Sequence, residues 1–84
     1  MFSVIIPTMW YANAYLEKLL RNLQQSDVVG EIIIIDNNWL CEDKVNIDFS
    51  KAIVLSMPEN IYVNEAWNIG VSIAKYDNIC ISND

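Results

Sequence analysis

The chain has 84 residues, 54% of them hydrophobic and 19% charged, which predicts a packed single domain over residues 1–84 and excludes an intrinsically disordered chain. Eleven acidic residues against five scattered basic ones give a net charge of −6, which argues against nucleic-acid binding through a basic surface. Any phosphate site must therefore use backbone N–H groups or a divalent cation.

The first apolar run, residues 3–7, predicts a buried strand. No basic region precedes it, and it is too short for a signal peptide or a membrane span, so we expect a cytoplasmic protein without a membrane-spanning segment. A helical repeat of apolar residues follows, at Tyr15, Leu16, Leu19, Leu20 and Leu23. It predicts an amphipathic helix that ends near residue 25 or 26, with Asn13 as its N-cap.

Two further apolar runs, residues 31–36 and 52–57, predict the second and third strands. The polar loop between them, residues 37–51, is expected to hold a short helical turn around residues 42–45. Cys41 in this loop and Cys80 near the end of the chain lack metal-ligand spacing, which predicts two reduced thiols. Histidine, the commonest zinc ligand and general base, is absent from the sequence.

A second helix is predicted over residues 63–75 and a fourth strand over residues 78–82. One stripe of the helix is apolar or small, comprising Val63, Ala66, Trp67, Gly70, Val71 and Ala74. A glycine within such a stripe indicates a close approach of the helix to the sheet.

Strands that alternate with helices predict an α/β fold with a Rossmann-like parallel sheet of four strands. Right-handed crossovers place strands one to three in sequence toward one edge. If the second helix covers the opposite face, strand four pairs beside strand one. The order is then 3-2-1-4, with helices on both faces, and this is the order that we expect.

In this order the sheet has a topological switch point between strands one and four, where ligands of open α/β sheets bind. Three polar strand ends converge there: Pro7-Thr8, Asp36-Asn37 and Asn83-Asp84. Thr8 is also a candidate turn cap, Asp36 a candidate Asx turn, and Asp84 a candidate solvent-facing acid. The sequence therefore predicts a ligand site at these ends.

Four segments resemble a known family. Residues 3–8, residues 31–38, the stretch from Asn60 to Gly70, and residues 81–84 are similar, in order and spacing, to the N-terminal half of family 2 glycosyltransferases. The resemblance covers nearly the whole chain but only a third to a half of a family catalytic domain. It implies a truncated GT-A fold that binds a nucleotide-diphosphate sugar donor.

The resemblance also implies roles for individual residues. Pro7 and Thr8 would touch the nucleotide, Asp36 and Asn37 would contact the uracil and the ribose, and Asn83 would contact the ribose. Where the family has Tyr-Asn after Pro-Thr, this chain has Met9-Trp10, so Trp10 either stacks on the base or covers the sheet.

The family's Asn-x-Gly-x-x-x-x-x-Asn-x-Gly stretch begins here at Asn60, with Tyr62 in place of its first glycine. Asn68 and Gly70 match the second half of the stretch. Asn68 would then face the diphosphate, or alternatively bond to local backbone in the helix interior.

Asp84 matches the last aspartate of the family's Asp-x-Asp-type motif, and Ser82 holds the position of the first acid in many members. The resemblance implies that Asp84 binds Mg²⁺ or Mn²⁺ together with the diphosphate oxygens. The cation would neutralise the leaving nucleoside diphosphate.

No residue can be assigned as catalytic, because in the family the base that deprotonates the acceptor and the acceptor-binding parts follow this point. We expect a glycosyltransferase fragment that is inactive alone. The alternative is a non-catalytic nucleotide-binding or protein-interaction module with half of the fold. A receiver-like domain is disfavoured, since strand three ends in Ser56-Met57-Pro58 without the aspartate that is phosphorylated there. A bare sheet edge beside strand four also predicts self-association or a partner chain.

Overall fold

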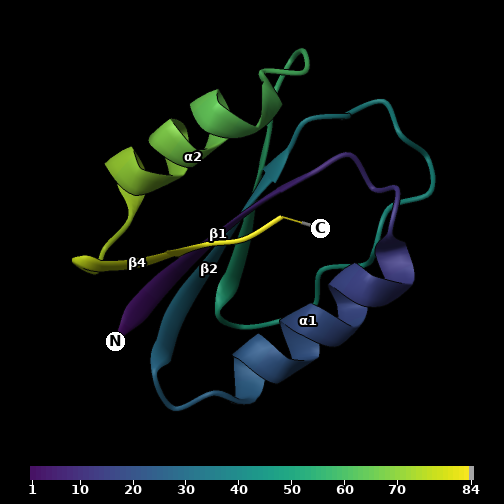
Figure 1. Cartoon of the computed structure of the whole chain (residues 1–84). Helices are drawn as coiled ribbons and strands as arrows, with labels where there is room; N and C mark the ends of the chain where they lie inside the picture. Colours follow the sequence, from purple (N-terminus) through teal and green to yellow (C-terminus); the bar gives the residue numbers. More distant parts are fainter. Residues whose placement is uncertain (84) are drawn as a thin grey trace.

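The computed structural model describes residues 1–83 of the chain, which form a parallel sheet flanked by two helices (Figure 1). The strands are β1 (Phe2–Thr8), β2 (Val29–Asp36), β3 (Ala52–Ser56) and β4 (Asn78–Ile81). The helices are α1 (Asn13–Gln25) and α2 (Tyr62–Ile73). The strands lie in the order β3-β2-β1-β4, and every pair is parallel. The predicted α/β class and strand order are therefore confirmed.

The two helices cover opposite faces of the sheet (Figure 1). Because side chains alternate along a strand, β1 and β2 supply a separate core to each face. The α1 side is built from Val4, Ile6, Leu16, Leu20, Ile32 and Ile34, and the α2 side from Ile5, Ile33, Ile35 and Ala66. The change of face between α1 and α2 is what brings β4 to the free side of β1.

The outer strands β3 and β4 are less buried than the central pair. Ile53 and Val54 of β3 are 48% and 38% exposed, and Ile81 of β4 is 50% exposed. Continuous apolar runs thus indicated burial on both faces correctly for β1 and β2 but wrongly for the two edge strands. The reason is that, within residues 1–83, each edge strand pairs with a neighbour on one side only, and the side chains of the two strands that pack, partly buried, against the two cores are Ala52, Leu55 and Ile79.

Helix α1 packs through Leu16 and Leu20, which are fully buried. Tyr15, predicted on the same apolar face, is 55% exposed, since it lies at the margin of the stripe. The predicted N-cap at Asn13 is also wrong, because the helix begins at Asn13 and Ala12 is its N-cap, with no side-chain bond. The Asn13 amide instead donates a hydrogen bond to the carbonyl of Asp43, 2.5 Å away.

Helix α2 approaches the sheet at Gly70, as the sequence predicts. A Cβ atom at Gly70 would lie 2.9 Å from Cδ1 and Cγ1 of Ile5, and nearer still to its Cγ2. Ala66, one turn earlier, is fully buried. Val71 is 49% exposed, so its predicted place on the buried stripe is wrong, because the close contact at Gly70 turns the neighbouring position outward.

The loop over residues 37–51 turns at residues 39–40 and has no helical turn at residues 42–45, contrary to expectation. Val45, Ile47 and Phe49 instead pack against the core on the α1 side. Their two-residue spacing is typical of an extended chain. An extended path lets all three apolar side chains face the core at once.

A buried carboxylate fixes the start of β4 at the amino edge of the sheet. Glu31 accepts hydrogen bonds from the hydroxyl of Ser3, at 2.5 Å, and from the backbone N–H of Lys75. The backbone N–H of Tyr76 donates to the Ser3 hydroxyl oxygen at 3.2 Å. These bonds align β4 with β1 and so determine where the carboxyl end of β4 lies.

Neither helix within residues 1–83 has the length and hydrophobicity that crossing a bilayer requires. Cys41 and Cys80 form no disulfide.

Candidate functional site

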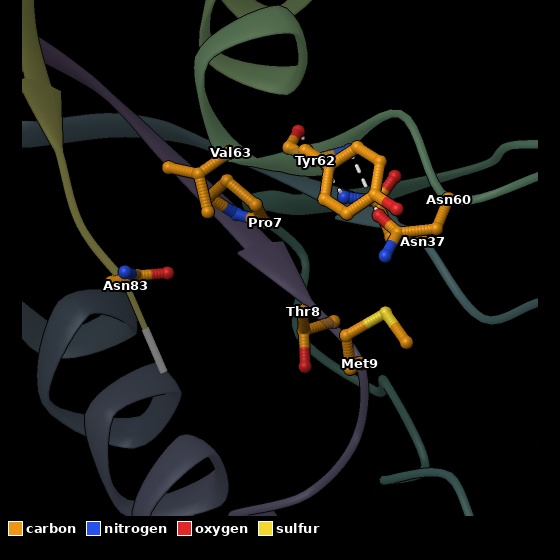
Figure 2. Close-up of a pocket in the computed structure, with 8 residues that line it drawn as sticks. All are labelled: Pro7, Thr8, Met9, Asn37, Asn60, Tyr62, Val63 and Asn83. Carbon is orange, nitrogen blue, oxygen red and sulfur yellow. Dashed lines mark hydrogen bonds between the residues drawn. The ribbon is translucent and has the colours of Figure 1, made fainter.

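A hollow of about 180 Å³ opens at the carboxyl edge of the sheet, beside the first turn of α2 (Figure 2). Its lining combines three strand ends with that turn, through Pro7, Thr8, Met9, Asn37, Asn60, Tyr62, Val63 and Asn83. The strand order places it at the switch point between β1 and β4, where α/β sheets bind ligands.

Four of the residues predicted to bind the nucleotide meet in this hollow: Pro7, Thr8, Asn37 and Asn83. Asn68 is exposed on α2 and does not line it. Asp36 is fully buried beneath the edge and does not line it either. Asp84, predicted to bind the metal, lies outside the described residues.

Thr8 lines the hollow, whereas Trp10, two residues later, does not. The backbone N–H of Trp10 donates to Oγ1 of Thr8 at 2.9 Å, so Thr8 has the turn-capping contact that was weighed against nucleotide binding. Trp10 has φ of 65°, a left-handed backbone that folds its indole back over the sheet. The ring is 5% exposed and packs in the α1-side core. Of the two roles weighed for Trp10, covering the sheet is the one observed.

Asp36 is the centre of a buried polar cluster. Its Oδ1 accepts from the indole N–H of Trp10 at 2.8 Å and from the backbone N–H of Asn38 at 2.9 Å. Its Oδ2 accepts from the Lys44 ammonium at 2.8 Å and from the Ser56 hydroxyl at 3.0 Å. Both carboxylate oxygens are thus directed inward, where they tie together the ends of three strands.

The environment of Asp36 keeps it ionised. Burial raises the pKa of this carboxyl, but hydrogen bonds from Lys44, Trp10, Asn38 and Ser56 outweigh burial and hold the pKa below its ordinary value of 3.8. The cluster therefore contains a stable ion pair between Asp36 and Lys44.

The sequence did not identify Lys44 as a site residue, although its ammonium group lies close to three other residues at the carboxyl edge of the sheet. It pairs with Asp36, donates to the carbonyl of Trp39 at 2.9 Å, and lies 5.9 Å from the centre of the Trp10 ring. A single lysine in a polar loop offers no pattern that would have identified it. Lys44 anchors the loop over residues 37–51 to the site.

The amides of Asn37 and Asn60 hold the start of α2 against the hollow. Oδ1 of Asn37 accepts from the backbone N–H of Ile61 at 3.4 Å, and its Nδ2 donates to the carbonyl of Tyr62 at 3.5 Å. Oδ1 of Asn60 accepts from the backbone N–H of Tyr62 at 2.8 Å. Tyr62 itself has φ of 64°, a conformation that favours glycine, at the position where the resembling family has glycine.

A second hollow, of about 220 Å³, continues along the edge and shares Met9, Asn37 and Asn60 with the first. Its wall is Trp39, whose indole N–H donates to the carbonyl of Pro58 at 3.0 Å and whose own carbonyl accepts from Lys44. Together the two hollows can therefore hold a longer ligand than the first hollow can hold alone.

Within residues 1–83, no three His, Cys, Asp or Glu side chains form a metal-binding group. Asp36 is already paired with Lys44, so it is not free to act as a metal ligand in this conformation. Asp84, the predicted metal ligand, directly follows the lining residue Asn83 in the sequence. The prediction of Mg²⁺ or Mn²⁺ stays a prediction.

Comparison of the chain with protein families, curated proteins and solved structures finds no match.

Proposed function

We propose that the hollow between β1 and β4 binds a nucleotide-diphosphate sugar, as the donor-binding part of a family 2-like glycosyltransferase domain. The observation that carries this proposal is the position of the hollow. It lies at the switch point of a parallel sheet, and four residues assigned to the nucleotide by resemblance line it.

The chemistry of the lining suits the uncharged parts of such a donor. Asn37, Asn60 and Asn83 contribute carboxamides, which offer both donors and acceptors to a base or to ribose hydroxyls. Sugar and base groups of this kind need paired hydrogen bonds rather than charge. This supports a nucleoside in the hollow.

We assign the diphosphate of the donor to the amino end of α2. The first backbone N–H groups of a helix lack intrahelical partners, and the helix dipole is positive at this end. Val63 of this first turn lines the hollow. Because the chain has a net charge of −6, the phosphates also require a cation, which we assign to Asp84 with Mg²⁺ or Mn²⁺. Such a cation supplies charge neutralisation of the leaving diphosphate.

A second candidate is a nucleotide-binding module without transfer activity. The observation that favours it is the engagement of Asp36, whose two oxygens already accept four hydrogen bonds. A base or ribose contact from this carboxylate would require Lys44 or Trp10 to leave it. Because the glycosyltransferase fragment is itself expected to be inactive alone, binding separates the candidates: a donor site should bind a nucleotide sugar at least as tightly as the matching nucleoside diphosphate, whereas a site for nucleotides alone should bind the nucleotide sugar more weakly.

Calorimetric titration with UDP, GDP, ADP and CDP tests the donor site. We expect at least one nucleoside diphosphate to bind in the presence of Mn²⁺, with affinity at least about tenfold weaker, or about 1.4 kcal/mol, once the metal is chelated. Asp84→Ala should abolish the effect of the metal, because it removes the assigned ligand.

The matched control is Asp77→Ala, which removes an exposed carboxylate just before β4, at the opposite edge of the sheet. This variant should bind with the affinity of the wild type and keep its dependence on Mn²⁺. Absence of binding by all four nucleotides, or binding that is indifferent to the metal, contradicts the donor site.

We also propose that the chain self-associates through its sheet edges. Ile53 of β3 and Ile81 of β4 are half-exposed apolar residues on strands that each have one unpaired edge within the described part of the chain, and such edges pair readily with other strands. Sedimentation velocity should show a dimer or larger species at micromolar concentration. The double variant Ile53→Lys with Ile81→Lys should raise the dissociation constant at least about tenfold, or about 1.4 kcal/mol.

Tyr15→Lys is the control for this experiment, since Tyr15 is as exposed as Ile81 but lies on α1. It should leave the association unchanged. A wild-type chain that sediments as a monomer at every concentration rules out edge pairing.

A further inference from the structure

Tyr62 combines three properties at the rim of the hollow. It is the first residue of α2, its backbone is left-handed with φ of 64°, and it is 73% exposed. Its side chain lies beside the amides of Asn37 and Asn60 (Figure 2). A large aromatic side chain therefore stands at the mouth of the candidate site.

The left-handed backbone is unfavourable for tyrosine, because its Cβ crowds the neighbouring peptide groups, whereas glycine adopts it freely. Hydrogen bonds on both sides of Tyr62 nevertheless hold its backbone in this conformation. The Tyr62 N–H is bonded to Asn60 and its carbonyl to Asn37. Exposure at 73% means that burial of the ring does not compensate for the strain. Strained residues cluster at ligand sites, and Tyr62, unlike the buried Trp10 with its similar φ, has its side chain exposed at the hollow.

The neighbouring amides have hydrogen-bonding capacity left over. Oδ1 of Asn60 is used by the Tyr62 N–H, while its Nδ2 donates to no group in residues 1–83. The amide of Asn83 across the hollow makes no hydrogen bond within the same range. A flat aromatic face next to free amide donors matches a ligand that has both a π face and polar edges. Nucleobases have this combination.

We propose that Tyr62 is the stacking platform for the base of the bound nucleotide, and that the Asn60 amide donates a hydrogen bond to the edge of that base. The inference rests on the proposed nucleotide site and adds a specificity-determining residue to it. Base–aromatic stacking tolerates every base, so Tyr62 contributes affinity, while the amide contributes the choice between bases.

Two variants with opposite consequences test this role. Tyr62→Gly should raise the melting temperature by about 4 °C, since it removes the backbone strain. It should also weaken binding of the best nucleoside diphosphate and of the corresponding nucleoside by about 5- to 100-fold, the range for one lost stack. Binding of inorganic diphosphate should not change. Tyr62→Phe keeps a ring and should bind as the wild type does.

The possible results separate failure of the stacking role from failure of the nucleotide site. Equal affinity of Tyr62→Gly and wild type for the nucleoside diphosphate overturns the stacking role but leaves the nucleotide site intact. An equal loss for inorganic diphosphate also overturns it, because the effect would then come from the start of α2 and not from the ring. Failure of the wild type to bind any nucleoside diphosphate removes both the site and this role.

Discussion

Asp36→Ala is expected to lower the free energy of unfolding by about 3–5 kcal/mol, the usual cost of breaking a buried ion pair. The substitution leaves the ammonium of Lys44, the indole N–H of Trp10 and the hydroxyl of Ser56 without their shared acceptor. The total free energy of unfolding of a domain of 84 residues is only about 4–12 kcal/mol. Urea denaturation followed by far-UV circular dichroism at pH 7 measures the difference.

Asp77→Ala provides the control, since this exposed acid makes no hydrogen bond in the described residues. It should change stability by less than about 0.5 kcal/mol, as surface substitutions do. If the two variants unfold at the same urea concentration, the cluster around Asp36 does not hold the strand ends together.

The contribution of the Asp36 carboxylate to stability should depend on pH in a definite direction. The pKa of Asp36 is depressed in the folded state below 3.8, so its contribution is present above the ordinary carboxyl pKa and is lost as the pH falls through the folded-state pKa. The difference in stability between wild type and Asp36→Asn should therefore be constant near neutral pH. It should shrink below about pH 3.8. A difference that grows with acidity would show that the carboxylate is not ionised in the folded protein.

Gly70→Val is expected to destabilise the domain by about 3 kcal/mol, at the upper end of the range for overpacking. The first added carbon would already lie within 2.9 Å of three side-chain atoms of Ile5. Ile5 is fully buried between α2 and the sheet and has no space to move into. Thermal and urea denaturation both measure this effect.

A second-site variant tests whether the clash is the cause. Ile5→Ala alone should cost about 2–5 kcal/mol because it leaves a cavity. Combined with Gly70→Val, it should cost less than the sum of the two single variants, since the new side chain fills that cavity. Asn68→Val, on the exposed face of the same helix, controls for the β-branched residue. Additive costs would mean that Gly70 matters for helix geometry and not for its contact with Ile5.

The fold could be predicted because its main features are local patterns. Unbroken apolar runs such as Ile32 to Ile35 indicated the central strands, and the stripe containing Ala66 and Gly70 indicated the helix that covers the second face. The outer strands carry runs of the same kind, which wrongly indicated burial on both faces for Ile53 of β3, whereas the exposure of Ile81 agrees with the bare edge expected beside strand four. Burial at an edge depends on how far the helices reach, which a strand's own sequence does not encode.

The site could be predicted only in part. Thr8 and Asn37 line the hollow as expected because they end strands, and strand ends have fixed places in a parallel sheet. The inward direction of Asp36 depends on Lys44, eight positions away, and no local pattern links these residues. Asn68 lies on the exposed side of α2 and away from the hollow, which is lined by Tyr62 and Val63 in the first turn of that helix.

The pairing of β1 with β4 has a consequence for how the hollow forms during folding. The hollow lies between the first and last strands of the described chain, so it exists only after the most distant segments have met. β4 is short and borders solvent, which places it among the parts that open most easily from a folded protein. Docking of β4 and occupation of the hollow are therefore linked equilibria, and a ligand that contacts Asn83 would stabilise the docked strand.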